Sequence, residues 1–170
     1  MTVRRIVILG EPVLRQKAKK IHRVDNSIRL LLDDMVETMK AAPGAGLAAP
    51  QVGVPLRAIV TNVDDKVRVV INPEIVEQSD EEYEDDEGCL SIPGWWGPVK
   101  RRTAVTVRGL GRTGKPVKIK AEGLEARCFQ HEIDHLDGIL FIDRMEDRSK
   151  LYKVESAREE QELEEEHAFT

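Results

Sequence analysis

Hydrophobic residues recur at helical spacing near the start of the chain and at strand-like spacing after it. Asn26 is a residue type that often caps a helix, and apolar side chains follow it three or four positions apart, at Ile28, Leu31, Leu32, Met35, Val36 and Met39. The sequence Ala41-Ala42-Pro43-Gly44 ends this run, because proline and glycine are poor helix formers. The pattern predicts an amphipathic helix between Asn26 and Pro43.

The middle of the chain predicts strands. Residues 57–63 and 67–72 are strand-like, and the continuously apolar Ala58-Ile59-Val60 indicates a central strand buried on both faces. Residues 104–110 and 116–121 flank Gly111-Arg112-Thr113-Gly114, which predicts a hairpin.

A second helix is expected after Gly123, ended by Asp137-Gly138. From Asp147 onward the residues are strong helix formers, but apolar positions fade after Val154, so we expect a terminal helix that docks at its start and frays at its end. Strands in the middle and helices at the edges predict one α+β domain of mostly antiparallel strands around a central helix, with N-terminal and C-terminal helices.

Composition fits this picture. A length of 170 residues with 41% hydrophobic residues suits one globular domain with a real core. The apolar run 6–9 is too short for the core of a signal peptide, and no apolar run approaches membrane-spanning length. We therefore expect a cytoplasmic protein whose two cysteines are thiols.

The net charge of −5 is unevenly distributed. Residues 77–87 contain eight acids and no base, whereas residues 100–127 hold nine bases and two acids. Residues 143–170 hold ten acids and five bases. Such patches are usually solvated surface and support a polyanionic partner only weakly.

The segment 129–138, FQHEIDHLDG, places His131 and His135 four residues apart, with Glu132 directly after the first. On a helix the two imidazoles lie on one face, one turn apart, and can bind a single ion. The glutamate then lies beside any water that the ion holds. A catalytic site of this kind takes a third protein ligand.

Several residues could supply that ligand. The metzincin pattern, HExxHxxGxxH, fits through Gly138 but has Phe141 at its last ligand position. The thermolysin-like pattern would use a later glutamate such as Glu155, which lies in a glutamate-rich segment without the accompanying motif residues. Cys128 is on the same helix, where a small buried packing residue is the more ordinary role. Cys89, after a glycine in EGCLS, is favoured by its setting but not decided by spacing.

Three segments resemble, in order, the signature motifs of peptide deformylases. Residues 44–51 read GAGLAAPQ, residues 87–91 read EGCLS and residues 130–135 read QHEIDH. The family motifs are G-φ-G-φ-A-A-x-Q, E-G-C-φ-S and Q-H-E-x-D-H, where φ is hydrophobic. The resemblance implies a catalytic domain over residues 1–146, built around a metal-binding helix, and leaves an acidic helical tail over residues 147–170 uncovered.

The resemblance implies a metal-dependent hydrolase that removes the N-formyl group from the N-terminal formylmethionine of newly synthesised proteins. It also implies that the ion is held by Cys89, His131 and His135. The ion would lower the pKa of a water from 15.7 towards ~7, and Glu132 would carry the proton from that water to the departing amine. The Gln51 side-chain amide and the Leu90 backbone N–H would stabilise the oxyanion.

Other residues are implied in binding the substrate. Gly44 and Gly46 allow another backbone to approach closely, which suits a peptide that joins the sheet edge as an extra strand, although a tightly packed strand entry would also explain them. Leu124, Arg127 and Cys128 precede the ligands on their helix and are expected to line the methionine pocket. The full expected set is Gly44, Ala45, Gly46, Glu87, Gly88, Leu124, Arg127 and Cys128. Residues 47–49 are expected in the core.

One segment departs from the family. After Pro93, many bacterial members carry an arginine that contacts the substrate backbone, but here the sequence is Gly94-Trp95-Trp96-Gly97-Pro98, which puts that contact in doubt. The two tryptophans would form either an apolar rim over the cleft or a cover for the sheet. His22 and His167 have no partner pattern and are expected at the surface.

The resemblance also implies a cofactor and partners. Fe²⁺ would be the physiological ion, with Zn²⁺, Ni²⁺ or Co²⁺ able to replace it. The partners would be N-formylmethionyl nascent peptides and, transiently, the ribosome, with no membrane or specific nucleic acid. Two rival functions are a zincin-type endopeptidase and an inactive ribosome-associated binding module; the intact Glu132 and Gln51 argue against the second.

The acidic tail would be repelled by ribosomal RNA, so docking is expected to use the basic stretch 100–112 or the N-terminal bases. The tail also contributes no plausible ligand once Cys89 completes the site, so truncation after Lys153 is expected to keep activity on short peptides within about two-fold.

Overall fold

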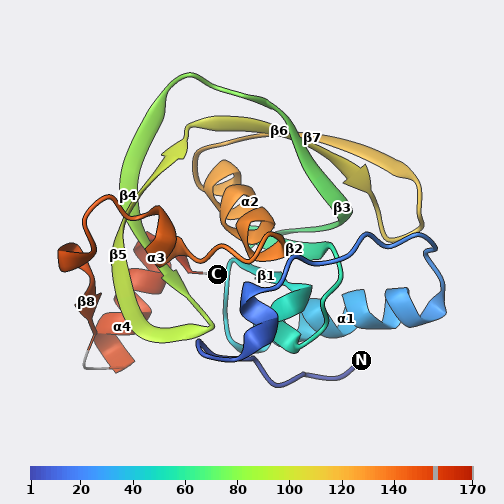
Figure 1. The fold of residues 1–170 in the computed structure, drawn as a ribbon, viewed down its shortest axis with the longest axis horizontal. Helices are drawn as coiled ribbons and strands as arrows, with labels where there is room; N and C mark the ends of the chain where they lie inside the picture. The colour runs from blue at the N-terminus through green and yellow to red at the C-terminus, as the bar shows by residue number, and fades with distance from the viewer. Residues whose placement is uncertain (155–156, 170) are drawn as a thin grey trace.

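A computed structural model describes residues 1–154 and 157–169 of the chain. Two sheets enclose a central helix, α2 (Gly123–Leu136), while α1 (Asn26–Ala41) lies on the outside and the chain ends near the centre (Figure 1). This is the expected α+β arrangement of mostly antiparallel strands around one helix.

The first sheet has five antiparallel strands in the order β1-β2-β3-β6-β7. The strands are β1 (Gly46–Ala48), β2 (Ala58–Val63), β3 (Lys66–Gln78), β6 (Ala104–Leu110) and β7 (Pro116–Glu122). Ala58, Ile59 and Val60 are fully buried, as their unbroken apolar run predicted. Their side chains alternate, because Ala58 and Val60 pack in the cluster that contains α1 residues and Ile59 packs in the cluster that contains α2 residues.

Helix α1 covers the outer face of this sheet. Its cap is Asp25, whose side chain accepts the backbone N–H of Ile28 at 3.1 Å, and Asn26 is the first helical residue. The predicted cap at Asn26 was therefore wrong by one residue, because the neighbouring Asp25 is an equally good capping type. The apolar face of α1 is buried as predicted, through Leu31, Leu32, Met35 and Met39.

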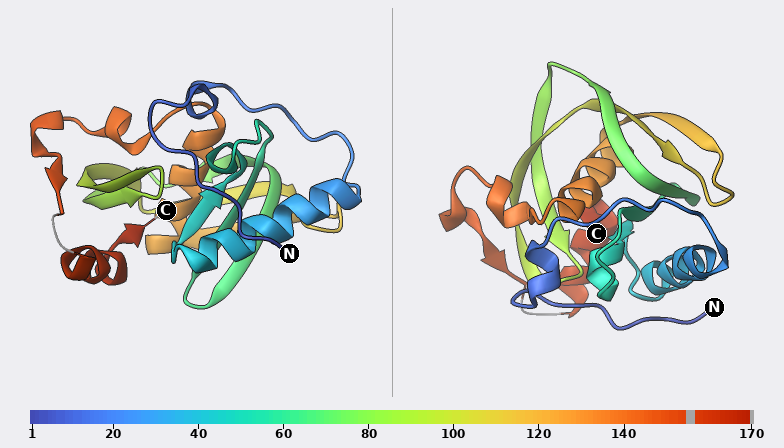
Figure 2. Two further views of the ribbon diagram at one scale, coloured as in Figure 1. Left: turned by 90° about the horizontal axis from the view of Figure 1, so that it is seen from below. Right: turned by 45° about the vertical axis from the view of Figure 1, so that its right-hand side comes forward.

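Helix α2 is enclosed, since every residue from Ala126 to Leu136 is buried. It contacts β1, β2, β6 and β7 of the first sheet and β5 (Ile92–Arg102) of the second (Figure 2). A helix surrounded in this way holds its polar side chains in the interior, where each must find a partner. This enclosure fixes the geometry of the His-Glu-x-x-His motif.

The second sheet has the order β8-β5-β4-β9, and the hydrophobic pattern predicted none of its four strands. The acidic run forms most of β4 (Glu82–Cys89), which pairs antiparallel with β5. Glu82 and Glu84 are exposed while Glu87 is buried, so the strand is acidic on its solvent face. A run of acids hides strand alternation from a hydrophobicity pattern.

The C-terminal segment differs from the single docked helix that we expected. After α3 (Phe141–Arg144) come a 3-10 turn at Arg148–Lys150, β8 (Tyr152–Lys153) and α4 (Ala157–Glu166). The last element, β9 (Ala168–Phe169), runs parallel to β4, with Ala168 opposite Glu87 and Phe169 opposite Gly88. The end of the tail is therefore docked, and not frayed. Across residues 1–154 and 157–169, no helix is long and apolar enough to cross a membrane.

Candidate metal and catalytic site

Three potential ligand atoms converge between the end of β4 and α2. His131 and His135 lie one turn apart on α2, and their Nε2 atoms are 3.2 Å apart. Cys89 is the last residue of β4, and its Sγ lies 3.4 Å from Nε2 of His135. All three residues are buried, and their ligand atoms lie within 4.8 Å of one another. In the described ranges they are the only such group.

The separations fit a single ion. Ligands about 2.0–2.3 Å from a tetrahedrally bound ion lie about 3.3–3.8 Å from one another, close to the two distances found here. One thiolate and two imidazoles form a soft donor set with a fourth position left for water or substrate. Cys128, the alternative thiol, is buried in a small cluster with Val63 and Ala45, in agreement with a packing role.

Protonation of two ligands reflects their burial. Burial, followed by the nearby His131 and Arg101, holds the pKa of His135 well below its ordinary value, so the imidazole is neutral and its lone pair is available to an ion. Burial also raises the pKa of the Cys89 thiol, and the carboxylates of Glu132 and Glu87 raise it further. A thiolate at this position therefore needs a compensating cation, which a metal ion would supply.

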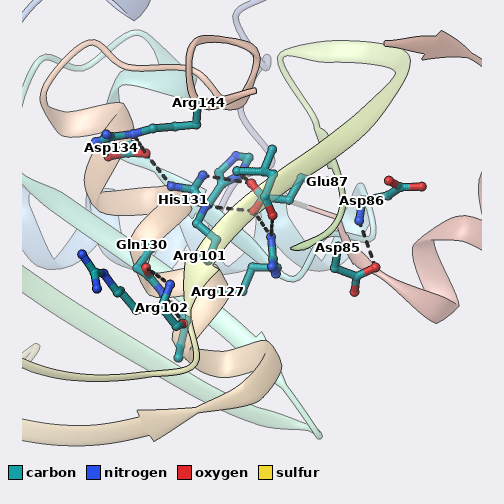
Figure 3. Close-up of polar contacts among 12 residues, drawn as sticks. Asp85, Asp86, Glu87, Arg101, Arg102, Arg127, Gln130, His131, Asp134 and Arg144 are labelled. Atoms are coloured by element: carbon teal, nitrogen blue, oxygen red, sulfur yellow. Dashed lines mark hydrogen bonds and ion pairs between the residues drawn. The ribbon is translucent and has the colours of Figure 1, made fainter. Parts of the chain in front are cut away.

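Glu87 orients the first histidine (Figure 3). Its Oε1 lies 2.8 Å from Nδ1 of His131, which leaves Nε2 to point toward Cys89 and His135. Arg101 donates two hydrogen bonds of 2.9 Å to the same carboxylate, and Arg127 donates a third of 2.5 Å. Burial alone would raise the pKa of Glu87, but Arg101 and His131 outweigh it and hold the pKa well below its ordinary value. Glu87 is therefore an ionised, fully bonded positioning residue.

The network continues to Asp134, the next acid on α2. Asp134 accepts a hydrogen bond of 2.7 Å from Arg101 and bonds of 2.9 and 3.1 Å from Arg144 (Figure 3). Arg101 thus joins β5 to both β4 and α2. The sequence pattern did not indicate Arg101; its only signal was that an acid such as Glu87, if buried, requires a cationic partner.

Glu132 is fully buried on the side of α2 that faces β1. Its Oε1 is 4.0 Å from Nε2 of His135, so the carboxylate borders the ligand cluster. A Cβ atom at Gly46 would overlap Oε2 of Glu132, so any larger residue at this point of β1 would force the carboxylate to move. Gly46 therefore has a defined task, which is to leave room for the carboxylate.

The side-chain amide of Gln51 also lies beside the ligand cluster. Its Oε1 accepts the backbone N–H of Ala48 at 3.0 Å, which fixes the orientation of the amide. Its Nε2 lies 3.1 Å from Oγ of Ser91 and 3.6 Å from Sγ of Cys89. Leu90, directly after Cys89, is also buried. Both expected oxyanion donors therefore belong to residues that adjoin the ligand cluster.

Six of the eight residues expected to contact substrate fall into two groups, and the other two, Gly46 and Gly88, are buried in β1 and β4. Gly44, Ala45 and Leu124 border a groove of about 310 Å³ whose other wall is formed by α4 residues and His167. Leu124 is 39% exposed. In contrast, Glu87, Arg127 and Cys128 are fully buried, and the guanidinium of Arg127 also binds the backbone oxygens of Val99 and Tyr83 at 2.9 Å. Residues 47–49 are buried in the core, as predicted.

The two tryptophans, His22 and His167 differ in how far they are exposed. Trp96 is fully buried, and its indole fills the space beside Gly88, so it serves as cover for the sheet; Trp95 remains 37% exposed. His22 is exposed as expected. His167 is partly buried, with 20% of its side chain exposed; its ring lies 6.2 Å from that of Trp96 and its Nδ1 is 2.9 Å from Oδ1 of Asp85.

Of the two other positions considered for the third ligand, only position 141 lies in the described part of the chain. Phe141, at the metzincin ligand position, is buried with its ring stacked 6.3 Å from that of His131. Glu155, at the thermolysin-like position, lies outside the described residues.

Known proteins agree on one family. The family model described as polypeptide deformylase matches residues 3–151. A peptide deformylase of Dehalococcoides mccartyi is 51% identical over 156 residues, covering 91% of this chain and 93% of that protein. One from Thermomicrobium roseum is 50% identical over 169 residues, covering 94% and 96%.

Solved structures lead to the same family. A peptide deformylase of Synechococcus elongatus in complex with actinonin is 44% identical, with a TM-score of 0.83, covering 85% of this chain and 80% of that chain. An Acinetobacter baumannii peptide deformylase bound to Met-Ala-Ser is 36% identical, with a TM-score of 0.82, covering 85% and 99%.

Proposed function

The chain belongs to the polypeptide deformylase family of hydrolases, which remove the formyl group from N-terminal formylmethionine, and from this premise we propose which of its residues carry out the reaction. Cys89, His131 and His135 hold the catalytic metal ion. The observation that supports this most strongly is the convergence of Sγ and two Nε2 atoms within 4.8 Å. When bound, the ion acidifies a water and polarises the formyl oxygen.

Glu132 moves the proton. One of its carboxylate oxygens accepts a proton from the attacking water, and the water oxygen forms a bond to the formyl carbon. The carbon–nitrogen bond then breaks, and Glu132 donates the proton to the departing nitrogen. The products are formate and a peptide with a free amine. The carboxylate is suited to this task because it borders the ligand cluster from a buried position.

Gln51 and Leu90 stabilise the charge that develops on the formyl oxygen. The donors are Nε2 of Gln51 and the backbone N–H of Leu90. Gln51 is held in place before the reaction by its bond to the backbone of Ala48, so little reorganisation is needed. Loss of one donor of this type lowers the rate by about 10²–10³-fold.

The peptide binds along two strand edges beside the cluster. One is β1 with the preceding Gly44 and Ala45, and the other is the end of β4 at Gly88. The methionine side chain enters beside Leu124 and Cys128, while Arg127 acts from behind by holding Glu87. Backbone pairing at two edges would bind peptides of varied sequence after the methionine.

Fe²⁺ is the ion we assign to the native site, in line with the family. The test compares chain loaded with iron under anaerobic conditions with chain loaded with zinc in air. We expect higher formate release from the iron form and its loss on exposure to oxygen. Equal rates in the two preparations would contradict the assignment of iron.

Residues 1–146 form the catalytic domain in this proposal, and residues 147–170 form an acidic tail. The family match over residues 3–151 supports a boundary in this region. The enzyme would act in the cytoplasm on nascent peptides, with transient ribosome contact through its basic segments and not through the tail.

Formate release from formyl-Met-Ala-Ser, with acetyl-Met-Ala-Ser as the matched substrate, tests the function. We expect turnover of the formyl peptide alone, lost with chelator and regained when metal is restored. Cleavage between residues of either peptide would instead indicate a zincin-type endopeptidase. Metal binding without any turnover would indicate an inactive binding module.

A further inference from the structure

We propose that the C-terminal segment 157–169 is a displaceable autoinhibitory strap, in which β9 takes the edge of β4 that a formyl peptide must pair with. The inference rests on the proposed function, because it assumes that the peptide binds beside Cys89. It concerns regulation of that site and adds no residue to the chemistry.

Strand pairing is the first observation. β4 has β5 on one side, so its remaining edge at Glu87 and Gly88 is where a further strand can add, and β9 occupies it. The next residue of β4 after Gly88 is the ligand Cys89. β9 also contacts α2, which carries His131 and Glu132, and the end of the chain lies beside α2 in both views of Figure 2. A peptide could not reach this edge while β9 holds it.

The groove beside the site is the second observation. Gly44, Ala45 and Leu124 form one wall, and the facing residues of the strap are Gln161, Glu164, Glu165 and His167. Gly44, Ala45 and Leu124 are the residues expected to contact substrate on the β1 side of the site. The strap therefore lies against both edges that the proposed substrate would use.

Three contacts attach the strap to the body of the molecule. Leu163 packs against the apolar cluster that contains Trp96 and Leu90. Glu160 accepts the backbone N–H of Gly94 at 3.2 Å. His167 lies at ion-pair distance from Asp85, as described above. These contacts hold the strap in one position on the body of the molecule and explain why its last two residues align with β4.

The same segment is poorly suited to permanent attachment. Its helix carries six glutamates and one arginine, and like charges three or four residues apart destabilise a helix. Burial and the neighbouring Glu160 and Glu165 raise the pKa of Glu164. Packing the helix against the body of the molecule therefore disfavours the charged form of this acid. The β9 ladder is only two residues long. Such an element opens readily, and a substrate peptide can compete with it.

Competition has a kinetic signature. If only the open fraction of molecules binds peptide, the apparent dissociation constant rises by the inverse of that fraction. Opening the strap should therefore lower KM and leave kcat unchanged. The acidic charge of the tail and its lack of a plausible ligand had suggested that it is neutral for short-peptide activity, and its pairing with β4 leads to the opposite expectation.

The test uses full-length, metal-loaded chains. Ala168→Pro removes a backbone N–H and restricts the strand, and Leu163→Ser removes the apolar anchor. We expect KM for formyl-Met-Ala-Ser to fall by about threefold or more in each variant, with kcat unchanged. Lys118→Gln is the matched control, since Lys118 is exposed on β7, the strand at the opposite edge of the first sheet from β1. KM equal to that of the unmodified chain in both strap variants would overturn the proposal.

Hydrogen exchange separates this inference from the proposed function. In metal-loaded Glu132→Gln, which should bind formyl-Met-Ala-Ser without turning it over, we expect added peptide to increase amide exchange in residues 157–169. Release of the strap by peptide in this variant, together with no formate production by the unmodified metal-loaded chain, would support the strap and reject the proposed function. Formate production by the unmodified chain, with no peptide-induced change in exchange in the variant, would reject the strap and keep the function.

Discussion

Cys89 and Cys128 are both buried thiols near α2, and only Cys89 has its sulfur beside the histidines. We predict that Cys89→Ala no longer retains a stoichiometric ion after dialysis, because two imidazoles alone would remain. Cys128→Ala is the matched control and should keep its ion. A stoichiometric ion in Cys89→Ala, measured by elemental analysis, would refute the ligand assignment.

Substitution of Glu132 should slow catalysis without removing the metal ion, unlike substitution of a ligand. We predict that Glu132→Gln binds metal normally, since the carboxylate borders the cluster without belonging to it, but releases formate at least ~10²-fold more slowly. Metal content and single-turnover formate release should be measured on the same preparation. Near-normal turnover in the metal-replete variant would make Glu132 a structural residue.

At the scale of single residues, the sequence predicted several members of the candidate site. The spacing of His131 and His135 requires only a helix to bring them together, and the resemblance supplied Cys89. Arg101 could not be found in this way, because its role depends on β5 crossing beside β4 and α2. The partners of His167 could not be predicted for a similar reason, since Asp85 and Trp96 are more than 70 residues away in the chain.

Among the elements, β4, β5 and α2 are joined through the carboxylate of Glu87. We predict that Glu87→Gln weakens metal binding by about 10–100-fold, because His131 loses the charged carboxylate acceptor that orients it. It should also destabilise the fold by about 3–5 kcal/mol, because Arg101 and Arg127 are left buried with one counter-charge fewer. Chelator competition and thermal unfolding measure the two effects.

Glu146→Gln is the matched control, because Glu146 pairs with Lys100 at the surface and its loss should change neither quantity. If the two variants behave alike, Glu87 has no positioning role.

The elements themselves were predictable where burial follows a simple period. The strand at Ala104–Leu110 was predicted with its observed bounds, and the strand after Pro116 ends one residue later than predicted. β4 was missed because its solvent face is acidic, and β9 because a two-residue strand has no periodic signal. Its partner strand, and not its own sequence, determines that β9 forms.

In the whole molecule, the ion would cross-link β4 of the second sheet to the enclosed helix. We predict that metal raises the unfolding temperature, since an ion that binds only the folded state stabilises it by ~4 kcal/mol at a free concentration a thousand times Kd. For a chain of this size this corresponds to roughly 8–16 °C. Calorimetry with and without chelator measures it, and Cys89→Ala should show little of the shift. An unfolding temperature that is independent of metal would place the ion outside the folded core.

The coordination of the bound ion tests the central claim most directly. X-ray absorption of the zinc-loaded chain should give one sulfur at about 2.3 Å and two imidazole nitrogens at about 2.0–2.1 Å, with one further light ligand. The sulfur signal should disappear in Cys89→Ala and persist in Cys128→Ala. A first shell without sulfur, or one whose sulfur is lost only in Cys128→Ala, would contradict the site formed by Cys89, His131 and His135.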